Sequence, residues 1–448
     1  MTKVVKLKKG LNINIKGKAV NELVDSSKSN LYAIMPTEFP GIIPKLLVKP
    51  DHVVKAGTPL FFNKHNPEVK FTSPVSGKVI AVERGARRKI LRIVVEADAE
   101  LQYEDFKKGD LSSLKREDVV DTLLNSGVWP FIRQRPYAII ANSKDTPKAI
   151  FISGFDNAPI APDYNFILKD QLDEFQNGVN ALAKLTEGKI HLNLDGEKEN
   201  IFSSINGVEV NQFFGKHPSS TIGTQISHVD PINKGEIVWY VNPQDVVIIG
   251  KLFSKGIYDA KRILALTGSQ VNAPKYYNTM VGAKMETIAK DNVNEDNSRY
   301  ITGNVLTGTQ TEKDLFLSFY DSQVSVIPEG NYYEFFGWIM PRFNKFSMSK
   351  TYFSWLMPKK EYALDTNTNG GERAFVMTEQ YEKVVPMDIY PVELLKACMA
   401  EDIDKMENLG IYEVAEEDLA LCDYVCTSKT EAQETIRKGI DLMIKELS

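Results

Sequence analysis

The sequence contains few residues that bind metals or form disulfides: three cysteines and five histidines among 448 residues. So few cysteines exclude a disulfide framework and indicate a reducing compartment. The histidines (His52, His65, His191, His217 and His228) offer little capacity to bind a metal. No apolar run reaches the ~18–20 residues that span a bilayer, and no apolar segment follows the basic residues 1–9. We expect a cytoplasmic chain that meets a membrane only through a partner.

The charge balance excludes another class of partner. The net charge is −5, whereas nucleic-acid binding requires a clustered excess of Lys and Arg. The length exceeds what one hydrophobic core supports and indicates roughly three or four domains, at about 100–200 residues per domain.

Two of the cysteines stand close together, but they are too few for an iron–sulfur cluster. Cys422 and Cys426 have the C-x3-C spacing that ends a cluster-binding run, and Thr427 stands where such a run has proline. A four-iron cluster takes about four cysteine ligands, and the third cysteine, Cys398, lies well upstream. The segment therefore has the outline of a cluster loop without its ligands, and we expect no metal on this chain.

Residues 1–105 contain short β-rich runs between Gly and Pro residues, which is typical of a small β barrel or sandwich. Residues 53–60 and 73–79 are similar to the two halves of a biotinyl/lipoyl-type domain. Such domains carry their prosthetic group on a lysine between the halves, with flanking residues that are missing around Lys64 and Lys70. We interpret this region as a scaffold rather than as a carrier of a modified lysine.

Residues 106–257 have a βαβ pattern. A buried-strand candidate at 149–153 precedes apolar residues at helical spacing (Leu172, Phe175, Val179, Leu182 and Leu185) and a second strand candidate at 189–194. The loop at 154–163 has two prolines and lacks G-x-G-x-x-G, so the pattern predicts a Rossmann-like domain without a dinucleotide site.

Three further regions follow. Residues 258–332 alternate strands and turns as in a β-grasp module. Residues 333–385 form an aromatic, Met-rich connector, for which core packing and an interface are equally good interpretations. Residues 386–448 are predicted to be helical, with a capping box at Thr430 and Gln433. Two apolar stripes mark the helices: Val392, Leu395, Met399, Ile403 and Met406, then Ala432, Ile436, Ile440, Met443 and Leu447.

Six segments in this order resemble the A subunit family of the Na+-translocating NADH:quinone oxidoreductase. They are FPGIIPKLL (39–47), NPEVKFTSPVSG (66–77), SGVWPFIRQRP (126–136), FFGW (335–338), NTNG (367–370) and LALCDYVC (419–426). The layout is also similar to the FMN-bearing subunit of complex I and the C subunit of the Rnf complex. The resemblance implies a multidomain α+β fold whose β-grasp module is of the SLBB type. It also implies a C-terminal helical domain that resembles a degenerate ferredoxin-like region.

The resemblance implies that this chain carries no cofactor, whereas FAD, FMN, riboflavin and iron–sulfur centres belong to partner subunits. It implies a peripheral position on the cytoplasmic side of the bacterial inner membrane, in a six-subunit complex, next to the membrane-embedded B subunit. The complex oxidises NADH, reduces quinone and exports Na+. Relatives have His-x-His where this chain has Gln225 and Ser227, which makes a metal role there doubtful. His228 alone is interpreted as a polar surface or core residue.

The family has been associated with quinone binding, and a quinone site needs apolar walls with a few hydrogen-bond donors. Eight residues in or beside two of the matching segments fit this description: Tyr32, Met35, Phe39, Trp129, Phe131, Arg133, Arg135 and Tyr137. The more common arrangement is that the aromatics pack a domain junction and the arginines pair with carboxylates. The alternatives are therefore a subunit that contributes to or borders the quinone site, a purely structural docking subunit, and, more weakly, an independent NADH or flavin enzyme.

Overall fold

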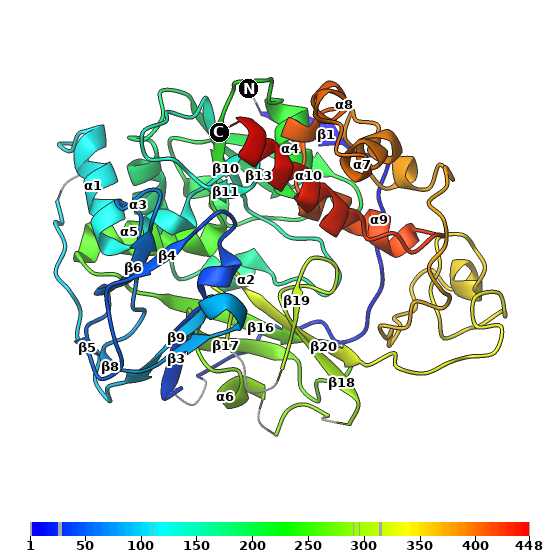
Figure 1. Ribbon diagram of the computed structural model, residues 1–448, viewed down its shortest axis with the longest axis horizontal. Coiled ribbons are helices and arrows are strands. Elements are labelled where there is room, and N and C mark those ends of the chain that lie inside the picture. Colours follow the sequence, from blue (N-terminus) through cyan, green and yellow to red (C-terminus); the bar gives the residue numbers. More distant parts are fainter. Residues whose placement is uncertain are drawn as a thin grey trace.

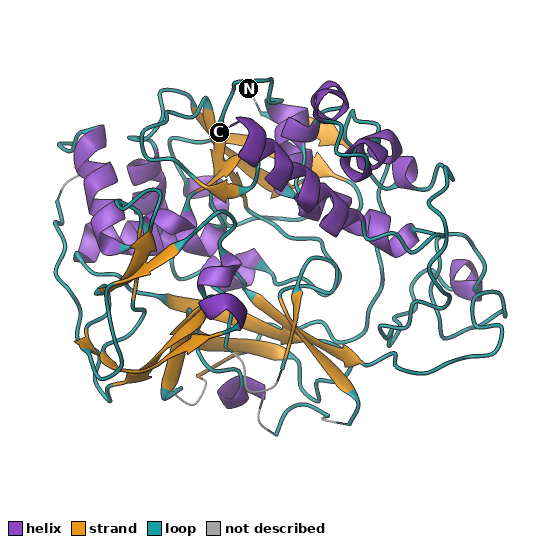
Figure 2. Cartoon of the chain, viewed as in Figure 1, coloured by secondary structure: helices purple, strands orange, loops and turns teal. Residues whose placement is uncertain are grey.

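The computed structural model describes residues 2–25, 29–109, 111–289, 291–294, 296–312 and 316–447. Two β-rich parts lie along the lower edge of the view in Figure 1, and an α/β sheet and the C-terminal helices lie above them. Figure 2 shows that the right-hand end is mostly loop. No helix within the described ranges is both long and apolar enough to span a membrane.

The first β-rich part is built from two antiparallel sheets. The four-stranded sheet consists of β3 (Leu31–Ile34), β9 (Ile90–Ala97), β8 (Gly77–Arg84) and β5 (Val53–Val54), in that order. The three-stranded sheet consists of β4 (Pro44–Leu46), β6 (Pro59–Asn63) and β7 (Lys70–Thr72). Phe61 and Phe71 stack at 4.4 Å in its core. The connections contain the short 3-10 turns η1 (Pro36–Glu38) and η2 (Ala86–Arg88).

The hairpin between β6 and β7 carries the two lysines that stand where a lipoyl-type domain would be modified. Lys64 is exposed. Lys70 donates a hydrogen bond to Asn125 at 2.7 Å and so ties the hairpin to the next domain. A lysine held in this way is part of a domain contact.

The α/β part contains a seven-stranded sheet. Its order is β1 (Lys3–Lys6), β14 (Glu209–Phe214), β13 (Lys189–Asp195), β12 (Ala149–Ser153), β15 (Val238–Tyr240), β10 (Arg133–Arg135) and β11 (Ile139–Ile140). The first five strands are parallel, and β10 and β11 are antiparallel to their neighbours. The helices and turns are α1 (Arg116–Ser126), η3 (Trp129–Phe131), α2 (Tyr164–Leu168), α3 (Leu172–Leu182), η4 (Phe202–Ser204), α4 (Ile222–Val229) and α5 (Pro243–Lys255).

The predicted βαβ unit is confirmed, because β12, α3 and β13 follow one another and the two strands pair in parallel. The apolar residues of α3 are spaced so that Phe175, Val179 and Leu182 fall on one buried face. That face packs on the hydrophobic core shared with the sheet.

The second β-rich part is a six-stranded mixed sheet. Its order is β19 (Thr309–Thr311), β18 (Ser298–Thr302), β20 (Gln323–Pro328), β16 (Lys261–Thr267), β17 (Lys275–Met280) and β2 (Leu23–Asp25). A short helix, α6 (Glu286–Ala289), follows β17.

The N-terminal residues pair with strands outside the two barrel sheets. β1 extends the α/β sheet beside β14, and β2 pairs with β17. Between these strands, Leu11, Ile13 and Ile15 belong to the hydrophobic core of the C-terminal helices. The first 25 residues therefore join three regions, and the barrel strands begin at Leu31.

The connector at 333–385 contains little regular structure beyond the turns η5 (Phe353–Leu356) and η6 (Tyr381–Lys383). The C-terminal region that follows is helical, as predicted. Its elements are α7 (Pro391–Met399), α8 (Ile403–Asn408), η7 (Ile411–Glu413), η8 (Glu416–Leu419), α9 (Ala420–Val425) and α10 (Ala432–Leu447).

Two local predictions for the C-terminal region are wrong. The stripe from Val392 to Met406 does not lie on one helix. α7 ends at Met399, Glu401 takes a left-handed conformation, and Met399 is 47% exposed. The capping box at Thr430 does not form, because α10 begins two residues later and Asp423 accepts hydrogen bonds from the backbone of Ala432 and, at 2.7 Å, from the Gln433 side chain. In the second stripe Ala432, Ile436, Ile440 and Met443 are buried, and the Leu447 side chain lies outside the described residues.

Candidate functional site

A polar cavity of about 190 Å³ lies at the carboxyl ends of β12 and β15. Ser153 ends β12, Tyr240 ends β15, and the first residues of α4 and α5 complete this edge. The chain runs from β12 outward to β13 and β14, then returns to place β15 on the other side of β12. This is the point where strand order reverses, and open α/β sheets bind ligands in the crevice at such a point.

Arg133, one of the eight predicted quinone-site residues, forms part of the cavity wall. It lies on β10 directly opposite Tyr240 of β15. Its guanidinium carbon lies 4.6 Å from the ring centre of Tyr240 and 4.5 Å from that of Tyr320. Tyr320 is itself fixed, because its hydroxyl donates to the carbonyl oxygen of Pro130 at 2.7 Å. The cation is thus held between two aromatic faces, a favourable arrangement for a partly buried arginine.

Two buried polar groups in the cavity wall have no hydrogen-bond partner among the described residues: the Tyr240 hydroxyl and Nε2 of His217. His217 Nδ1 lies 3.3 Å from Oδ1 of Asn157, which can only accept, so Nδ1 carries the proton and Nε2 a lone pair. Burial lowers the pKa of His217 to about 4, which keeps the ring neutral near pH 7. The cavity therefore offers one free acceptor and one hydroxyl that can donate.

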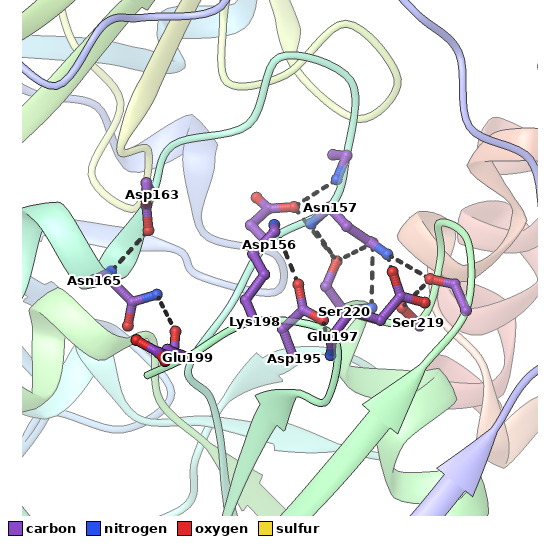
Figure 3. A network of polar contacts seen from close by, with 12 residues as sticks. Asp156, Asn157, Asp163, Asn165, Asp195, Glu197, Lys198, Glu199, Ser219 and Ser220 are labelled. Carbon is purple, nitrogen blue, oxygen red and sulfur yellow. Dashed lines mark hydrogen bonds and ion pairs between the residues drawn. The ribbon is translucent and has the colours of Figure 1, made fainter. Parts of the chain in front are cut away.

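The loop after β12 is fastened to the segment before α4 by a network of side-chain hydrogen bonds (Figure 3). Asn157 donates to Ser219 Oγ at 2.7 Å and accepts from Ser220 Oγ at 2.7 Å, and Asp156 accepts from the backbone of Ala158 at 2.8 Å. These contacts hold in place the stretch where a nucleotide-binding loop would carry glycines. The cavity therefore has a fixed polar floor.

Arg135 lies two residues beyond Arg133 but does not line the cavity. It is completely buried and forms ion pairs with Asp418 at 2.8 Å and with Glu417 at 2.7 Å. Tyr137 packs its ring against Tyr412 at 6.0 Å, and its carbonyl oxygen accepts from Arg437 at 3.0 Å. Both predicted residues therefore join the α/β domain to the C-terminal helices.

Phe39 and Phe131 are buried in one aromatic cluster, and Trp129, which is also buried, packs on a different ring. Phe39 and Phe131 come from different domains and meet on Phe319, with ring centres at 5.1 and 4.3 Å. Trp129 packs edge-on against Trp239 at 5.5 Å and donates to the carbonyl oxygen of Ala141. The contacts of these three aromatic rings are those of core packing, which is the more common arrangement for such residues.

Tyr32 and Met35 are not part of this cluster. Tyr32 is buried on β3 and lines a different cleft of about 1250 Å³ between the barrel, the α/β domain and the six-stranded sheet. Met35 is half-buried against a small apolar cluster that contains Phe316. Of the eight predicted residues, Arg133 alone lines the switch-point cavity. Phe39 packs on Tyr320, the ring on the other side of Arg133, and Phe131 reaches Tyr320 through Phe319.

Glu38 is an acidic residue beside this aromatic cluster. Its carboxylate accepts from the backbone of Phe319 at 3.2 Å. Burial raises the pKa of Glu38 to about 8, a bond with Ser318 opposes the shift, and the nearby charge of Asp321 adds to it. At neutral pH this carboxyl therefore holds a proton next to the aromatic rings.

Glu38 should make stability depend on pH. The folded chain keeps this group protonated up to a pKa of about 8, while the unfolded chain releases the proton near its ordinary pKa of 4.5. The folded state thus binds more protons between these values, and stability falls as pH rises, by up to about 1.4 kcal/mol per pH unit. We expect Glu38→Gln to flatten the urea-unfolding free energy measured at pH 5.5, 6.5 and 7.5. The exposed Glu68→Gln should keep the parent's slope, and a Glu38→Gln curve parallel to the parent's would contradict the assignment.

The described residues contain no cluster of three or more His, Cys, Asp or Glu side chains able to hold a metal ion. The three cysteines are buried in the C-terminal core. Burial raises the pKa of Cys398 to about 11. Burial also raises the pKa of Cys422 well above its usual value, so both remain neutral thiols. His228 is half-buried, and its Nδ1 contacts the carbonyl oxygen of Thr224 at 2.9 Å.

The sequence interpretation missed Tyr240, Tyr320 and His217. A usable signal existed for Tyr240, because it stands in a short apolar run, Ile237-Val-Trp-Tyr-Val241, directly before Asn242 and Pro243, residues typical of a helix start. Tyr320 and His217 stand in loops, where no periodicity marks a functional residue.

The fold and the cavity define a multidomain protein in which a barrel domain, an α/β domain and a third β domain precede a helical C-terminal region. Family models described as "NqrA N-terminal barrel-sandwich hybrid domain", "NqrA second alpha/beta domain" and "NQRA C-terminal domain" match residues 5–98, 114–258 and 263–313.

Full-length relatives agree with this match. The proteins of Photorhabdus laumondii and of Neisseria meningitidis serogroup B are each 37% identical over 447 residues, covering 99% of this chain and 100% of each relative. That of Yersinia pestis bv. Antiqua is 38% identical over 437 residues, covering 97% and 98%. All three are named as the A subunit of the Na(+)-translocating NADH-quinone reductase. The chain belongs to this family.

Among solved structures, the chain is similar to a chain of an NAD+-reducing NiFe hydrogenase in the air-oxidized state. The identity is 12%, the TM-score is 0.39, and the match covers 77% of this chain and 67% of that one. This likeness is too weak to support an argument about fold or function.

Proposed function

We propose that this chain works as the A subunit of a six-subunit Na+-translocating NADH:quinone oxidoreductase. In this proposal it is a peripheral subunit on the cytoplasmic side, bound next to the membrane-embedded B subunit. FAD, FMN, riboflavin and iron–sulfur centres are carried by the other subunits. Full-length similarity to proteins of that name supports the assignment. The chain's own contribution is to help shape the site where quinone is reduced.

The fold details carried by the resemblance belong to this proposal as well. The α/β domain is Rossmann-like, since its mainly parallel sheet reverses strand order between β12 and β15. The C-terminal helices are the remnant of a ferredoxin-like domain, which accounts for the C-x3-C spacing of Cys422 and Cys426 in a buried core.

The observation that carries the quinone proposal is the pairing of Arg133 with the unpartnered Tyr240 hydroxyl in one cavity wall. A quinone carbonyl requires donors, and both groups can donate. The cavity volume of about 190 Å³ exceeds the ~150 Å³ of an engineered protein cavity that binds benzene, so a single ring fits by size. Among the eight predicted residues Arg133 is the one that would touch the ring, and Phe39 and Phe131 would support the wall.

The test replaces these two donors in the assembled complex. A hydrogen bond from a charged donor contributes ~1.5–3 kcal/mol, so Arg133→Leu should lower quinone-dependent NADH oxidation by roughly ten- to a hundredfold. Tyr240→Phe, which removes a neutral donor, should lower it about three- to tenfold. NADH oxidation with ferricyanide should stay at the parent's rate, because it needs only the partner flavoprotein.

Lys45→Leu is the matched control, because Lys45 also lies over an aromatic ring, that of Phe62 at 5.6 Å, but in the barrel. It should leave both rates unchanged. If Arg133→Leu and Tyr240→Phe also leave the quinone-dependent and ferricyanide-dependent rates unchanged, these two residues have no role in quinone reduction.

The second candidate is a purely structural docking subunit of the same complex. The Arg135 ion pairs and the burial of Phe39, Trp129 and Phe131 favour it, because these predicted site residues all serve domain packing. Saturable binding of a quinone to the purified chain would argue against this candidate.

A further inference from the structure

Exposed apolar side chains are concentrated in one short part of the connector. Of the 22 large hydrophobic residues classed as exposed among the described residues, ten lie between Tyr332 and Leu356. Tyr333 is fully exposed and Phe335 is 84% exposed. Large exposed apolar patches of this kind mark interaction surfaces, whereas single exposed residues are ordinary.

This stretch contains a repeated hexapeptide. Residues 336–341 read FGWIMP and residues 353–358 read FSWLMP, so phenylalanine, tryptophan, methionine and proline recur at the same places. In both copies the Trp and the following aliphatic residue are about half exposed: 49% and 50% for Trp338 and Ile339, 52% and 54% for Trp355 and Leu356. Basic residues follow each proline directly, Arg342 in the first copy and Lys359 with Lys360 in the second.

The two copies lie side by side. The Tyr352 hydroxyl, just before the second copy, donates to the carbonyl oxygen of Gly337 in the first at 2.6 Å. The backbone of Phe353 donates to the carbonyl oxygen of Arg342 at 2.9 Å. The yellow to gold segment that holds both copies projects from the right-hand side of the molecule in Figure 1. We call residues 335–343 and 353–359 the paired Trp surface.

The charge of this region is opposite to that of the chain. Residues 332–360 contain five basic residues and one acidic residue, in a protein of net charge −5. The acidic residue, Glu334, is ion-paired with Arg342 and Lys345. Lys350 is exposed and lies 6.0 Å from the ring centre of Trp355, and Lys359 is exposed as well.

We propose that the paired Trp surface binds directly to the surface of a bilayer that contains anionic lipid. Trp is enriched at the level of lipid headgroups, Ile and Leu enter the acyl boundary, and Lys and Arg are attracted to anionic headgroups. Each copy offers these three elements in the same order. Protein interfaces are depleted in lysine, which favours lipid over a protein partner. The chain would then touch the membrane itself as well as its partner subunits.

The experiment uses the purified full-length chain and two kinds of vesicles, phosphatidylcholine alone and phosphatidylcholine with about one quarter phosphatidylglycerol. Co-sedimentation at ~0.1 M salt should show binding to the anionic vesicles, weakened at high salt. Brominated lipid should quench Trp338 and Trp355, while the fully buried Trp129 and Trp239 keep their emission.

Two variants test the two parts of the surface. W338A/I339A/W355A/L356A should weaken partitioning into anionic vesicles by at least about tenfold, because it removes the apolar side chains that enter the bilayer. Lys350→Glu with Lys359→Glu should weaken it by a similar factor, because it reverses the local charge. L47A/V53A is the control, since it removes two exposed apolar side chains, 48% and 79% exposed, from the barrel. It should bind like the parent.

Other outcomes would overturn the proposal. The proposed lipid contact is wrong if the parent chain does not bind anionic vesicles. It is also wrong if the fourfold variant binds them as well as the parent does. If the parent does not bind vesicles but the fourfold variant no longer co-purifies with the other subunits in detergent, the surface is a protein interface instead.

Discussion

Replacing Arg135 by Met is expected to lower the free energy of unfolding by about 3–5 kcal/mol, the cost of leaving a buried charge without its partner. Arg135 and Asp418 are both 0% exposed, and their ion pair at 2.8 Å joins residues 283 positions apart in the sequence. In the variant the Asp418 carboxylate must either remain unpaired or take up a proton. Urea unfolding followed by circular dichroism measures the loss.

A double variant separates the ion pair from the packing around it. Removing Asp418 as well, in R135M/D418L, eliminates the unpaired charge and should recover a large part of the lost stability. Glu417→Gln is the milder comparison, because the Glu417 side chain is 31% exposed, and should cost about 1 kcal/mol or less. A loss below 1 kcal/mol in Arg135→Met itself would contradict the buried ion pair.

The partner of Arg135 could not be identified from the sequence. Pairing with a carboxylate was one of the two interpretations open for this residue, but no local pattern indicates which acid lies opposite. A surface pair would have been worth only ~0–1 kcal/mol. Burial makes the loss of one partner far more costly, and burial of an arginine is set by elements that meet only in the folded chain.

Sequence periodicity predicted the fold best for single helices and strands, because the pattern of each lies within one short segment. The strand at 149–153, the helix that contains Phe175 and Val179, and the strand that begins at Lys189 were all read from periodicity and are confirmed. By contrast, β1 pairs with β14 across more than 200 residues, and nothing in residues 3–6 marks that partner.

In the candidate cavity as well, some residues could be found from the sequence and others only from the folded structure. Arg133 was identified through the family segment in which it stands, and its register opposite Tyr240 places both residues in one wall. Tyr320 and His217 reach the cavity region from loops whose positions depend on the six-stranded sheet and on the network around Asn157. No single-sequence signal could assemble these residues, because their proximity is a tertiary property.

Helix α5, whose first residues form one wall of the cavity, packs on α3 through glycines. A methyl group at Gly250 would lie far inside van der Waals contact with the carbonyl oxygen of Glu174 in α3, and one at Gly178 would meet the carbonyl oxygen of Val246 in α5. The two helix backbones are therefore in direct contact at this crossing. Only glycine allows so close an approach, so side chains elsewhere on the two helices cannot compensate for a larger residue here.

We expect Gly250→Ala to destabilise the protein by about 3 kcal/mol, at the upper end of the cost of overpacking a core. Helix propensity alone predicts the opposite sign, a gain of ~0.8–1.0 kcal/mol, so the sign of the measured change decides which effect wins. Gly371→Ala is the matched control, because nothing lies within 4 Å of its added methyl group, and it should change stability by less than about 0.5 kcal/mol. Chemical unfolding of both variants beside the parent makes the comparison. If Gly250→Ala proves neutral or stabilising, the helices are not in contact through their backbones, and the wall that α5 gives to the cavity is not fixed by this crossing.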